Sequence, residues 1–528
     1  MAKHKIVVCD HIHQKGLDLL AKEADIELLN ASSVPKSELL PLLQDADIAI
    51  TRSSTDVDSA FLEATKKIRA VVRAGVGVDN VDIDGCSRKG IVVMNVPTAN
   101  TIAAVELTLA HMLSACRNFP GANDQLKNAR LWKREDWYGT ELKDKKLGVI
   151  GFGNIGSRVA LRAKAFEMNV IAYDPYIKPS KATDLGIAYT SNFDDILACD
   201  MITIHTPKNK ETINLIGKEE IAKMKDGVIL INCARGNLYN EEALYEGLQS
   251  GKIRWAGLDV FNKEPATNNP LLDLPNVYVT PHIGANTLES QEKIAIQAAE
   301  AAIEAARGSN YPNALNLPIK ESELPLFVKP YLELVQKMGF FATQANKAPI
   351  HSFKIIAEGE ISQYIDSLST FGLVGALNAS LGDKVNYVNA PYVATERGIE
   401  LKSESKSAQG GYKNKITVKL TTEKDIMTLS GTVFDENVQR IVEINGFGLD
   451  IEPKGRMILF KNTDVPGVIG MIGTTLAKHQ INIADFRLGR NNHNQALAVI
   501  IVDDDVKKEV IEELRAIKAC LGIENVVL

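Results

Sequence analysis

The sequence lacks the features that mark secreted, membrane-bound and nucleic-acid-binding proteins. Its six cysteines are scattered without a Cys-x-x-Cys pair, which favours reduced thiols over disulfides or a metal site. No apolar run reaches the roughly 18 residues of a membrane helix, and the N-terminal MAKHKIVVCD is predicted to form a strand and not a signal peptide. The net charge of −6 argues against nucleic acid or an anionic membrane as a partner. We therefore expect a cytoplasmic protein.

The 528 residues predict three or four domains, at about 150 residues each. Short apolar runs alternate with helical segments over residues 1–98 and again over 146–282, which is typical of parallel sheets in an α/β fold. Residues 99–127 are predicted to form a helix as far as Pro120 that crosses between these two units. An alanine-rich helix is predicted over residues 284–307, and its return to the first unit would enclose a cleft between the two sheets.

The remaining residues predict two further units and an arm. Residues 319–450 begin with a helix, and their strands are predicted at 352–359, 415–422, 426–434 and 439–451. Residues 455–528 have the order strand, helix, strand, strand, helix, strand, which is the βαββαβ ferredoxin-like pattern. Residues 128–145 carry two tryptophans and several charges. They are interpreted either as an exposed arm at a subunit contact or as a loop that packs on its own domain.

A dinucleotide-binding fingerprint follows the strand that begins at Lys146. Gly151 permits a tight turn, Gly153 allows backbone amides to approach a pyrophosphate, and Gly156 allows the helix to pack on the strand. Asn154 and Ile155 open that helix, whose N-terminal N–H groups favour an anion. Asp174 ends the next strand and is suited to a ribose 2′-hydroxyl, so NAD is favoured over NADP.

Three polar residues follow three consecutive predicted strands of the same unit. They are Arg235, Glu264 and His282. Ligands of an open parallel sheet bind at the carboxyl ends of its strands, so the three side chains are expected near the nucleotide. Oxidation of a hydroxy acid requires a base, and histidine titrates near neutral pH. A carboxylate would orient its ring, and an arginine would hold the substrate carboxylate with two hydrogen bonds. Each residue alone is equally compatible with a solvated or capping role.

The motifs GFGNIG, INCARG, GLDVFNKEP and TPHIGANT occur in this order, and the sequence resembles the D-2-hydroxyacid dehydrogenases over residues 3–315. The resemblance implies a substrate-binding domain over 1–98 and 283–315 and an NAD-binding Rossmann domain over 99–282. It implies that His282 is the acid/base, Glu264 its partner and Arg235 the substrate anchor. It further implies that the nicotinamide end of the cofactor site is lined by Thr206, Pro207, Cys233, Ala234, Arg235, Asp259, His282, Gly284 and Ala285.

The resemblance also places Arg52, Arg73, Val76 and Asn100 around the substrate. Two arginines beyond Arg235 supply more positive charge than a simple 2-hydroxy acid needs, and they suit a phosphorylated one. Arg134 on the arm is interpreted either as a further substrate contact from a partner subunit or as a solvated side chain.

The last two predicted units restrict the resemblance to the long members of this family. FKNTDVPGVIG followed by INIADF resembles an ACT domain, a small amino-acid-sensing module, and 319–450 resembles an intervening regulatory domain. Long family members with both units oxidise 3-phospho-D-glycerate to 3-phosphooxypyruvate with NAD, at the first step of L-serine biosynthesis. This resemblance implies a homo-oligomer, usually a tetramer. It implies L-serine as an effector at Asn462, Asp464 and Asn482; the alternative is a module that only holds subunits together.

Two other functions fit the same fold. One is an NAD-dependent dehydrogenase acting on glycerate or glyoxylate, although its short members usually lack the last 200 residues or so of this chain. The other is a non-enzymatic NAD sensor, such as the corepressors that share this fold. A sensor would tolerate loss of the base, whereas an enzyme needs His282 and Glu264 in contact.

Overall fold

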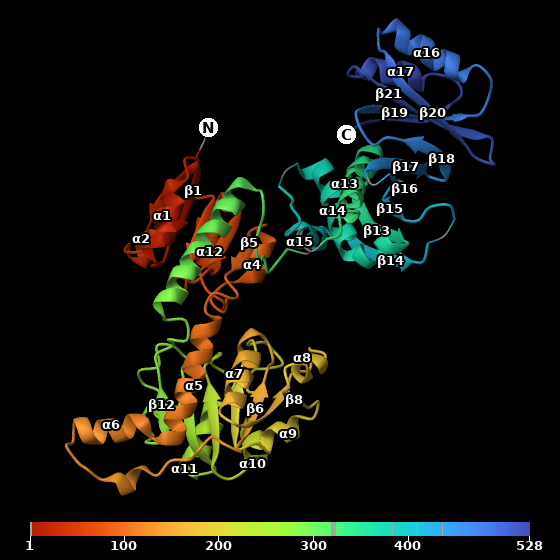
Figure 1. The fold of residues 1–528 in the computed structure, drawn as a ribbon. Coiled ribbons are helices and arrows are strands. Elements are labelled where there is room, and N and C mark those ends of the chain that lie inside the picture. Colours follow the sequence, from red (N-terminus) through yellow and green to blue (C-terminus); the bar gives the residue numbers. More distant parts are fainter. Residues whose placement is uncertain (1–2, 318–323, 383, 409, 436) are drawn as a thin grey trace.

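The computed structural model describes residues 3–317, 324–382, 384–408, 410–435 and 437–528, and it contains four sheets, each at the centre of its own unit (Figure 1). The predicted start of the intervening domain at residue 319 lies outside these residues. None of the described helices combines the length and the apolarity needed to cross a lipid bilayer. The predicted α/β class with a ferredoxin-like C-terminal unit is confirmed.

The first unit has five parallel strands in the order β2-β1-β3-β4-β5. Helix α12 (Leu288–Arg307) returns to this unit, and its alanines are buried in the same core as β1, β3 and β4 (Figure 1). The approach is close, because a Cβ at Gly16 in α1 would lie 2.7 Å from the Ala295 carbonyl oxygen. The other elements are β1 (His4–Val8), α1 (Gln14–Lys22), β2 (Ile26–Asn30), α2 (Lys36–Leu42), β3 (Ile48–Thr51), α3 (Ser59–Ala64), β4 (Ala70–Arg73), α4 (Ile83–Arg88) and β5 (Val92–Asn95).

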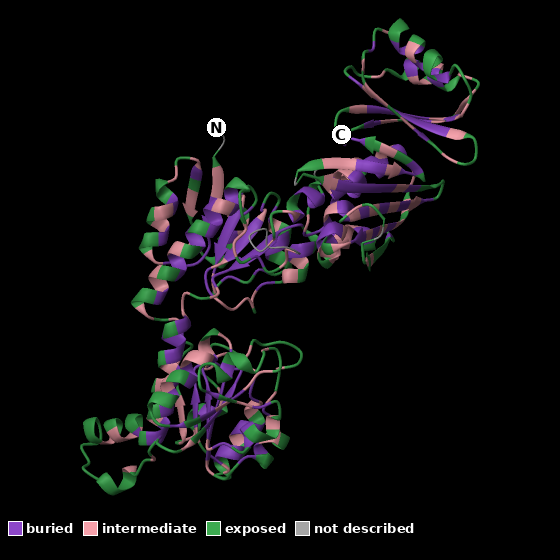
Figure 2. Cartoon of the chain, turned by 45° about the vertical axis from the view of Figure 1, so that its right-hand side comes forward, coloured by how far each residue is buried: buried purple, intermediate pink, exposed green. Residues whose placement is uncertain are grey.

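Helix α5 (Thr101–Arg117) runs from the first unit to the second. The predicted continuation of this helix to Pro120 is wrong: Asn118 has a left-handed φ of 49°, which ends α5, and Pro120 lies in the first turn of α6 (Phe119–Lys127). Helix α6 and the short helix η1 (Arg134–Trp137) form an arm that projects from the second unit and is largely exposed (Figure 2). Trp132 is 76% exposed, whereas Trp137 packs on Gly121 and donates a hydrogen bond to Gln125.

The second unit has a parallel sheet in the order β12-β11-β10-β9-β6-β7-β8. Strands β10, β11 and β12 are adjacent, so the loops that follow them leave the same edge of the sheet. Its elements are β6 (Lys146–Ile150), α7 (Asn154–Ala165), β7 (Asn169–Tyr173), α8 (Ser180–Thr183), β8 (Ala188–Tyr189), α9 (Phe193–Leu197), β9 (Met201–Ile204), α10 (Lys218–Lys223), β10 (Val228–Asn232), α11 (Glu241–Gln249), β11 (Ile253–Leu258), η2 (Pro270–Asp273) and β12 (Val277–Val279).

The third unit has a mixed sheet in the order β14-β13-β15-β16-β17-β18, with only the β13–β14 pair parallel. The predicted single strand over 439–451 is wrong. Asn445 and Gly446 both have positive φ and form the tight turn of a hairpin, which is the geometry that an Asn-Gly pair favours. Its elements are α13 (Val328–Ala345), β13 (Ile350–Glu358), η4 (Glu360–Tyr364), α14 (Ile365–Leu381), α15 (Ala390–Glu396), β14 (Glu400–Lys406), β15 (Lys415–Thr422), β16 (Ile426–Phe434), β17 (Val438–Ile444) and β18 (Phe447–Ile451).

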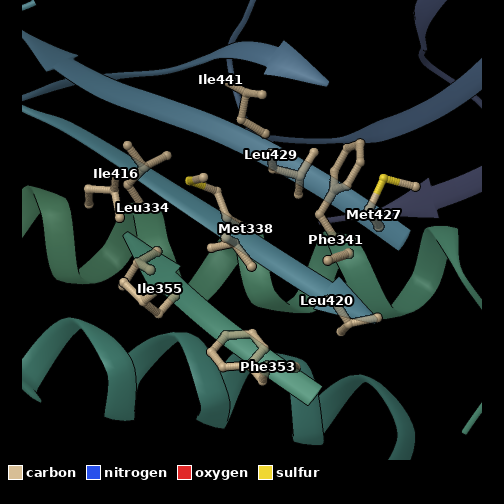
Figure 3. Close-up of a cluster of buried hydrophobic side chains, with 14 of the residues drawn as sticks. Leu334, Met338, Phe341, Phe353, Ile355, Ile416, Leu420, Met427, Leu429 and Ile441 are labelled. Carbon is tan, nitrogen blue, oxygen red and sulfur yellow. The ribbon is translucent and has the colours of Figure 1, made fainter. Parts of the chain in front are cut away.

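Side chains of α13 fill the space between this sheet and α14. Strand β15 alternates between buried and half-buried positions, so that Ile416 and Leu420 face Met338 and Phe341 (Figure 3). The two helices approach backbone to backbone, because a Cβ at Gly339 would lie 2.0 Å from the Gly372 carbonyl oxygen. Glycine at this position is therefore a requirement of packing.

The fourth unit has the predicted βαββαβ order and the antiparallel sheet β20-β21-β19-β22. Helices α16 and α17 cover one face, and the other face, through Met457, Leu497 and Val526, belongs to the hydrophobic core of the third unit. Gln344 of α13 bonds both the amide and the carbonyl of Val527, each at 2.9 Å. The two units therefore pack as one body. The elements are β19 (Arg456–Thr463), α16 (Val468–Lys478), β20 (Ile483–Arg490), β21 (Gln495–Val502), α17 (Lys508–Arg515) and β22 (Cys520–Val527).

We expect Gly339→Ala to lower the thermal unfolding midpoint, because overpacking a tight contact costs about 1–3 kcal/mol. Gly473→Ala is the matched control: it adds the same methyl group to a helix, α16, where no atom lies within 4 Å of the new Cβ. The control is expected to keep or raise the midpoint, since alanine is favoured over glycine in helices by about 0.5–1 kcal/mol. Calorimetry measures the unfolding midpoint of both variants. Equal midpoints would contradict the close contact at Gly339.

Candidate active site

The glycine fingerprint at the end of β6 has the geometry of a pyrophosphate cradle. Gly151 has a φ of +85°, and a Cβ at Gly156 would lie 2.0 Å from the Gly151 carbonyl oxygen. A Cβ added at Gly153 would meet no atom within 4 Å, so the backbone there is open to a ligand. Asn154 and Ile155 begin α7, and their amides belong to its first turn. These residues fit a bound dinucleotide.

Asp174 lies at the end of β7 beside this cradle. Its Oδ2 accepts the Phe152 amide at 2.8 Å and its Oδ1 accepts the Tyr176 amide at 2.9 Å. The carboxylate is thus fixed next to the glycine turn, where it can accept a ribose hydroxyl and would repel a 2′-phosphate. Thr206 follows β9 next to Gly151, and its buried Oγ1 has no partner among the described residues. A polar ligand would satisfy that atom.

His282 and Glu264 are in direct contact. His282 Nδ1 lies 2.7 Å from Glu264 Oε2, and Glu264 Oε1 accepts the Phe261 amide at 3.0 Å. The hydrogen bond from Glu264 raises the pKa of His282 against the opposing effect of burial. Burial alone would raise the pKa of Glu264, but the bonds from His282 and Phe261 outweigh it and lower that pKa. The pair therefore favours imidazolium next to carboxylate, while His282 remains half exposed for a ligand.

The turn that carries His282 rests on Asp259. This carboxylate is fully buried, and it accepts the amides of Ile283 and Gly284, each at 2.8 Å. Ala285, at the end of the turn, accepts a hydrogen bond from Gln291 through its carbonyl. Asp259 and Gly284 thus support the turn that carries His282.

Three of the predicted nicotinamide-side residues lie on the neighbouring loops. Pro207 accepts the Thr212 hydroxyl through its carbonyl. Cys233 is buried, and burial raises the pKa of its thiol, so the thiol stays neutral. Ala234 accepts the Arg235 guanidinium at 2.7 Å and so helps to orient it.

Three arginines converge from the two units. Arg235 Nε of the second unit lies 3.1 Å from Asp79 Oδ2 of the first unit. Burial, followed by the charges of Arg52 and Arg235, lowers the pKa of Arg73 to about 10. The Nε atoms of Arg52 and Arg73 are buried without a partner among the described residues. Buried guanidinium donors of this kind are suited to an anionic ligand.

Two further predicted substrate residues flank this arginine cluster. Asn100 caps α5 without using its side chain, and its buried Oδ1 has no partner in the described part of the chain. Val76 is half-buried in the turn after β4, and its carbonyl accepts the Asn95 side chain at 2.8 Å. The structure does not bring Arg134 to this cluster, because Arg134 is exposed in η1 on the arm.

Two acids at the site were not predicted. Asp10, directly after β1, accepts the amides of Arg52 and Thr55 and the Thr55 hydroxyl. Asp79 pairs with Arg235. Asp10 could have been found by the rule that identified Arg235, since it is a polar residue at the carboxyl end of a predicted parallel strand. Asp79 carries no such signal, because its partner comes from another unit.

The predicted effector residues are only partly together. Asn462 is 3% exposed, and its Oδ1 has no partner among the described residues. Together with Asp464 and Arg490, which pair at 3.1 Å, it lines a cavity of about 340 Å³. Asn482 does not line this cavity within the subunit; its amide donates to Asp503 at 2.6 Å.

The fold and the site define a class, the NAD-dependent dehydrogenases of D-2-hydroxyacids. Residues 109–284 match the model of the D-isomer specific 2-hydroxyacid dehydrogenase, NAD binding domain. Residues 327–445 match the D-3-phosphoglycerate dehydrogenase intervening domain, and residues 456–519 match the ACT domain.

Similarity to known proteins extends over nearly the whole chain. The D-3-phosphoglycerate dehydrogenase of Methanocaldococcus jannaschii is 38% identical over 516 residues, which cover 97% of this chain and 98% of that protein. The enzyme of the same name from Bacillus subtilis is 37% identical over 523 residues, with coverages of 98% and 99%. The chain belongs to the D-3-phosphoglycerate dehydrogenase family, and it is an NAD-dependent oxidoreductase.

Solved structures match the first two units. The TT0316 protein from Thermus thermophilus is 33% identical with a TM-score of 0.54, covering 59% of this chain and 99% of that one. The D-lactate dehydrogenase from Aquifex aeolicus, complexed with NAD and lactic acid, is 30% identical with a TM-score of 0.51, covering 58% and 96%.

We expect Glu264→Gln to lower the pKa of His282, because the variant removes the charge that raises it. With His282 as the expected base, oxidation of the 2-hydroxy acid needs the neutral ring, so the rising limb of kcat/KM should move to lower pH. Ketone reduction needs imidazolium, so its falling limb should also move to lower pH. Both profiles are measured from NADH absorbance. Glu246→Gln, an exposed carboxylate on α11, is the control, and an unmoved limb in Glu264→Gln would contradict the assignment.

Proposed function

We propose that this protein oxidises 3-phospho-D-glycerate to 3-phosphooxypyruvate, the first committed step of L-serine biosynthesis. The observation that carries this proposal is a cluster of three arginines next to a histidine–glutamate pair. The charge of Arg235 acts on both groups, since it contributes to the pKa of Arg73 and to that of His282. Bound NAD would accept the hydride that leaves C2 of the substrate. The shared name of the relatives supports this substrate over glycerate or glyoxylate.

His282 is proposed as the acid/base. During oxidation its Nε2 takes the proton of the C2 hydroxyl, because Nδ1 is occupied by Glu264 at 2.7 Å. Glu264 accepts a hydrogen bond from the Nδ1–H group throughout, which fixes the tautomer and stabilises the imidazolium that forms. In the reverse direction, the imidazolium returns the proton to the oxygen.

The arginines are proposed to divide the substrate between them. Arg235 lies next to His282 and holds the carboxylate, since a guanidinium matches that group with two parallel hydrogen bonds. Arg52 and Arg73 hold the phosphate, and Val76 and Asn100 contact the carbon chain between the two anionic ends. Asp10 and Asp79 partly balance the cationic charge when no anion is bound.

A homo-oligomer, usually a tetramer in such relatives, is proposed for this chain, with the arm as one contact. Phe119, Trp132 and Tyr138 on or beside the arm are 67%, 76% and 79% exposed. Large apolar side chains gathered on one projection favour a protein contact. Arg134 lies on the same projection, and we propose that it reaches the site of a partner subunit. A cytoplasmic location is proposed because all six cysteines are free.

L-serine is proposed as an effector of the ACT unit. The cavity beside Asn462 holds a buried amide oxygen without a described partner and an exposed ion pair of Asp464 with Arg490. These groups suit the ammonium, carboxylate and hydroxyl of a small amino acid. Asn482 would complete the site from a second ACT unit. Repeating the activity assay with L-serine tests this proposal.

The function is tested by following NADH formation from 3-phospho-D-glycerate and from D-glycerate. We expect the phosphorylated acid to be used far more efficiently. His282→Ala should lower turnover by at least about a hundredfold, since the general base is lost, while NADH binding measured by fluorescence stays intact. Unchanged turnover would refute the role of His282, and efficient use of D-glycerate alone would refute the substrate.

We expect Arg52→Ala to raise KM for 3-phospho-D-glycerate far more than KM for D-glycerate, because the lost guanidinium contacts only the phosphate. Arg88→Ala, on the surface of the same unit with Asp84 as its partner, is the matched control. Equal effects on both substrates would place the phosphate elsewhere.

A further inference from the structure

The proposed mechanism leaves one buried histidine of the second unit without a role. His111 lies in the middle of α5, is 4% exposed, and its Nε2 lies 2.8 Å from Thr280 Oγ1. The ring packs against the sheet, since a Cβ at Gly257 in β11 would lie 2.9 Å from the His111 Cβ. His111 of α5 is therefore fixed against β11 and against Thr280, the residue that follows β12.

The hydrogen bonds continue from Thr280 to Asp259, which supports the turn that carries His282. Thr280 Oγ1 lies 2.6 Å from Asp259 Oδ1, and both oxygens of Asp259 accept amides of the turn, from Ile283 and Gly284. Because the carboxylate only accepts, Thr280 donates its one proton to Asp259 and accepts from His111. Burial lowers the pKa of His111 to about 4, so the ring is neutral and carries its single proton on Nε2.

The turn that carries His282, where this series of hydrogen bonds ends, has a strained backbone. His282 has a φ of +52°, which a residue with a Cβ adopts only where its surroundings hold it. Its amide donates to the Asp259 carbonyl at 2.9 Å. Asp259 thus accepts hydrogen bonds from the turn through its backbone carbonyl and both side-chain oxygens. Thr280 bonds this side chain directly, and His111 bonds Thr280.

We propose that Thr280 and His111 are positioning residues, and that the chain His111–Thr280–Asp259 holds the His282 imidazole toward the substrate alcohol. These hydrogen bonds also connect the turn that carries His282 to α5, the helix that runs between the first two units. This inference rests on the proposed role of His282. A small displacement of the base is enough to slow proton transfer, because catalysis depends on the distance and direction of the attacking nitrogen.

The test compares three variants. Thr280→Val keeps the shape and removes the hydroxyl, and Thr280→Ser restores the hydroxyl. Thr190→Val is the matched control, because Thr190 Oγ1 also bonds a carboxylate at 2.6 Å, that of Asp195, and is 9% exposed in the same unit. Both valine variants should lose similar thermal stability. Only Thr280→Val should lose kcat, by about tenfold, with KM and NADH affinity within about twofold and with Thr280→Ser close to the wild type.

Two results would overturn the inference: equal kcat in the two valine variants, or equal loss in Thr280→Val and Thr280→Ser. If the unfolding midpoint of Thr280→Val lies far below that of Thr190→Val, variants of His111, at the other end of the hydrogen-bond series, test the inference. His111→Leu removes the donor and should lower kcat, whereas His111→Gln keeps an N–H near the Nε2 position and should retain most of it; equal values for these two would refute the chain.

The outcome is separable from that of the proposed function. Wild-type inactivity toward 3-phospho-D-glycerate would refute the proposed substrate. The same variants would then be compared with whichever 2-hydroxy acid the wild type oxidises.

Discussion

The proposed chemistry of this protein depends on the hydrogen bond between His282 Nδ1 and Glu264 Oε2. This bond forms between loops that follow β11 and β12, which are adjacent parallel strands with Leu258 opposite Val279. Parallel strands end at the same edge, so two residues distant in sequence leave the sheet side by side. The bond then shifts the pKa of each partner toward its charged form. Each loop is held separately, Glu264 by the Phe261 amide and His282 by Asp259.

The local charge of the substrate site is opposite to that of the whole chain. The chain carries a net charge of −6, yet Arg52, Arg73 and Arg235 converge at one place, where Asp10, Asp79 and Glu264 partly balance them. Burial, and then the neighbouring charges of Arg52 and Arg235, disfavour the charged form of Arg73 and lower its pKa. A ligand with two anionic ends would stabilise these cations, in keeping with the proposed phosphorylated substrate.

The third and fourth units form one body that contacts the first unit at a defined place. The ACT sheet buries one face in the core around α13, so packing connects the unit that holds the cavity beside Asn462 to the intervening unit. Asn386 of that unit donates to the Gly90 carbonyl at 2.8 Å, next to α4. Asn316 bonds Ser87 of α4 from the segment after α12. A shift of the intervening unit would therefore act on α4, which follows the turn that carries Asp79.

Local signals in the sequence determined the nucleotide cradle, the parallel sheets and the βαββαβ unit, because each depends on residues within one strand, turn or helix. The same signals identified Arg235, Glu264 and His282, since the end of a strand is visible in the sequence. They missed the hairpin at Asn445, the end of α5 at Asn118, and the partners Asp10 and Asp79. The pairing of Arg235 with Asp79 and the chain from His111 through Thr280 to Asp259 were decided only by the tertiary structure. Such contacts depend on how helices and sheets pack. Packing brings together residues that are far apart in the sequence, and no helical or strand periodicity links their positions.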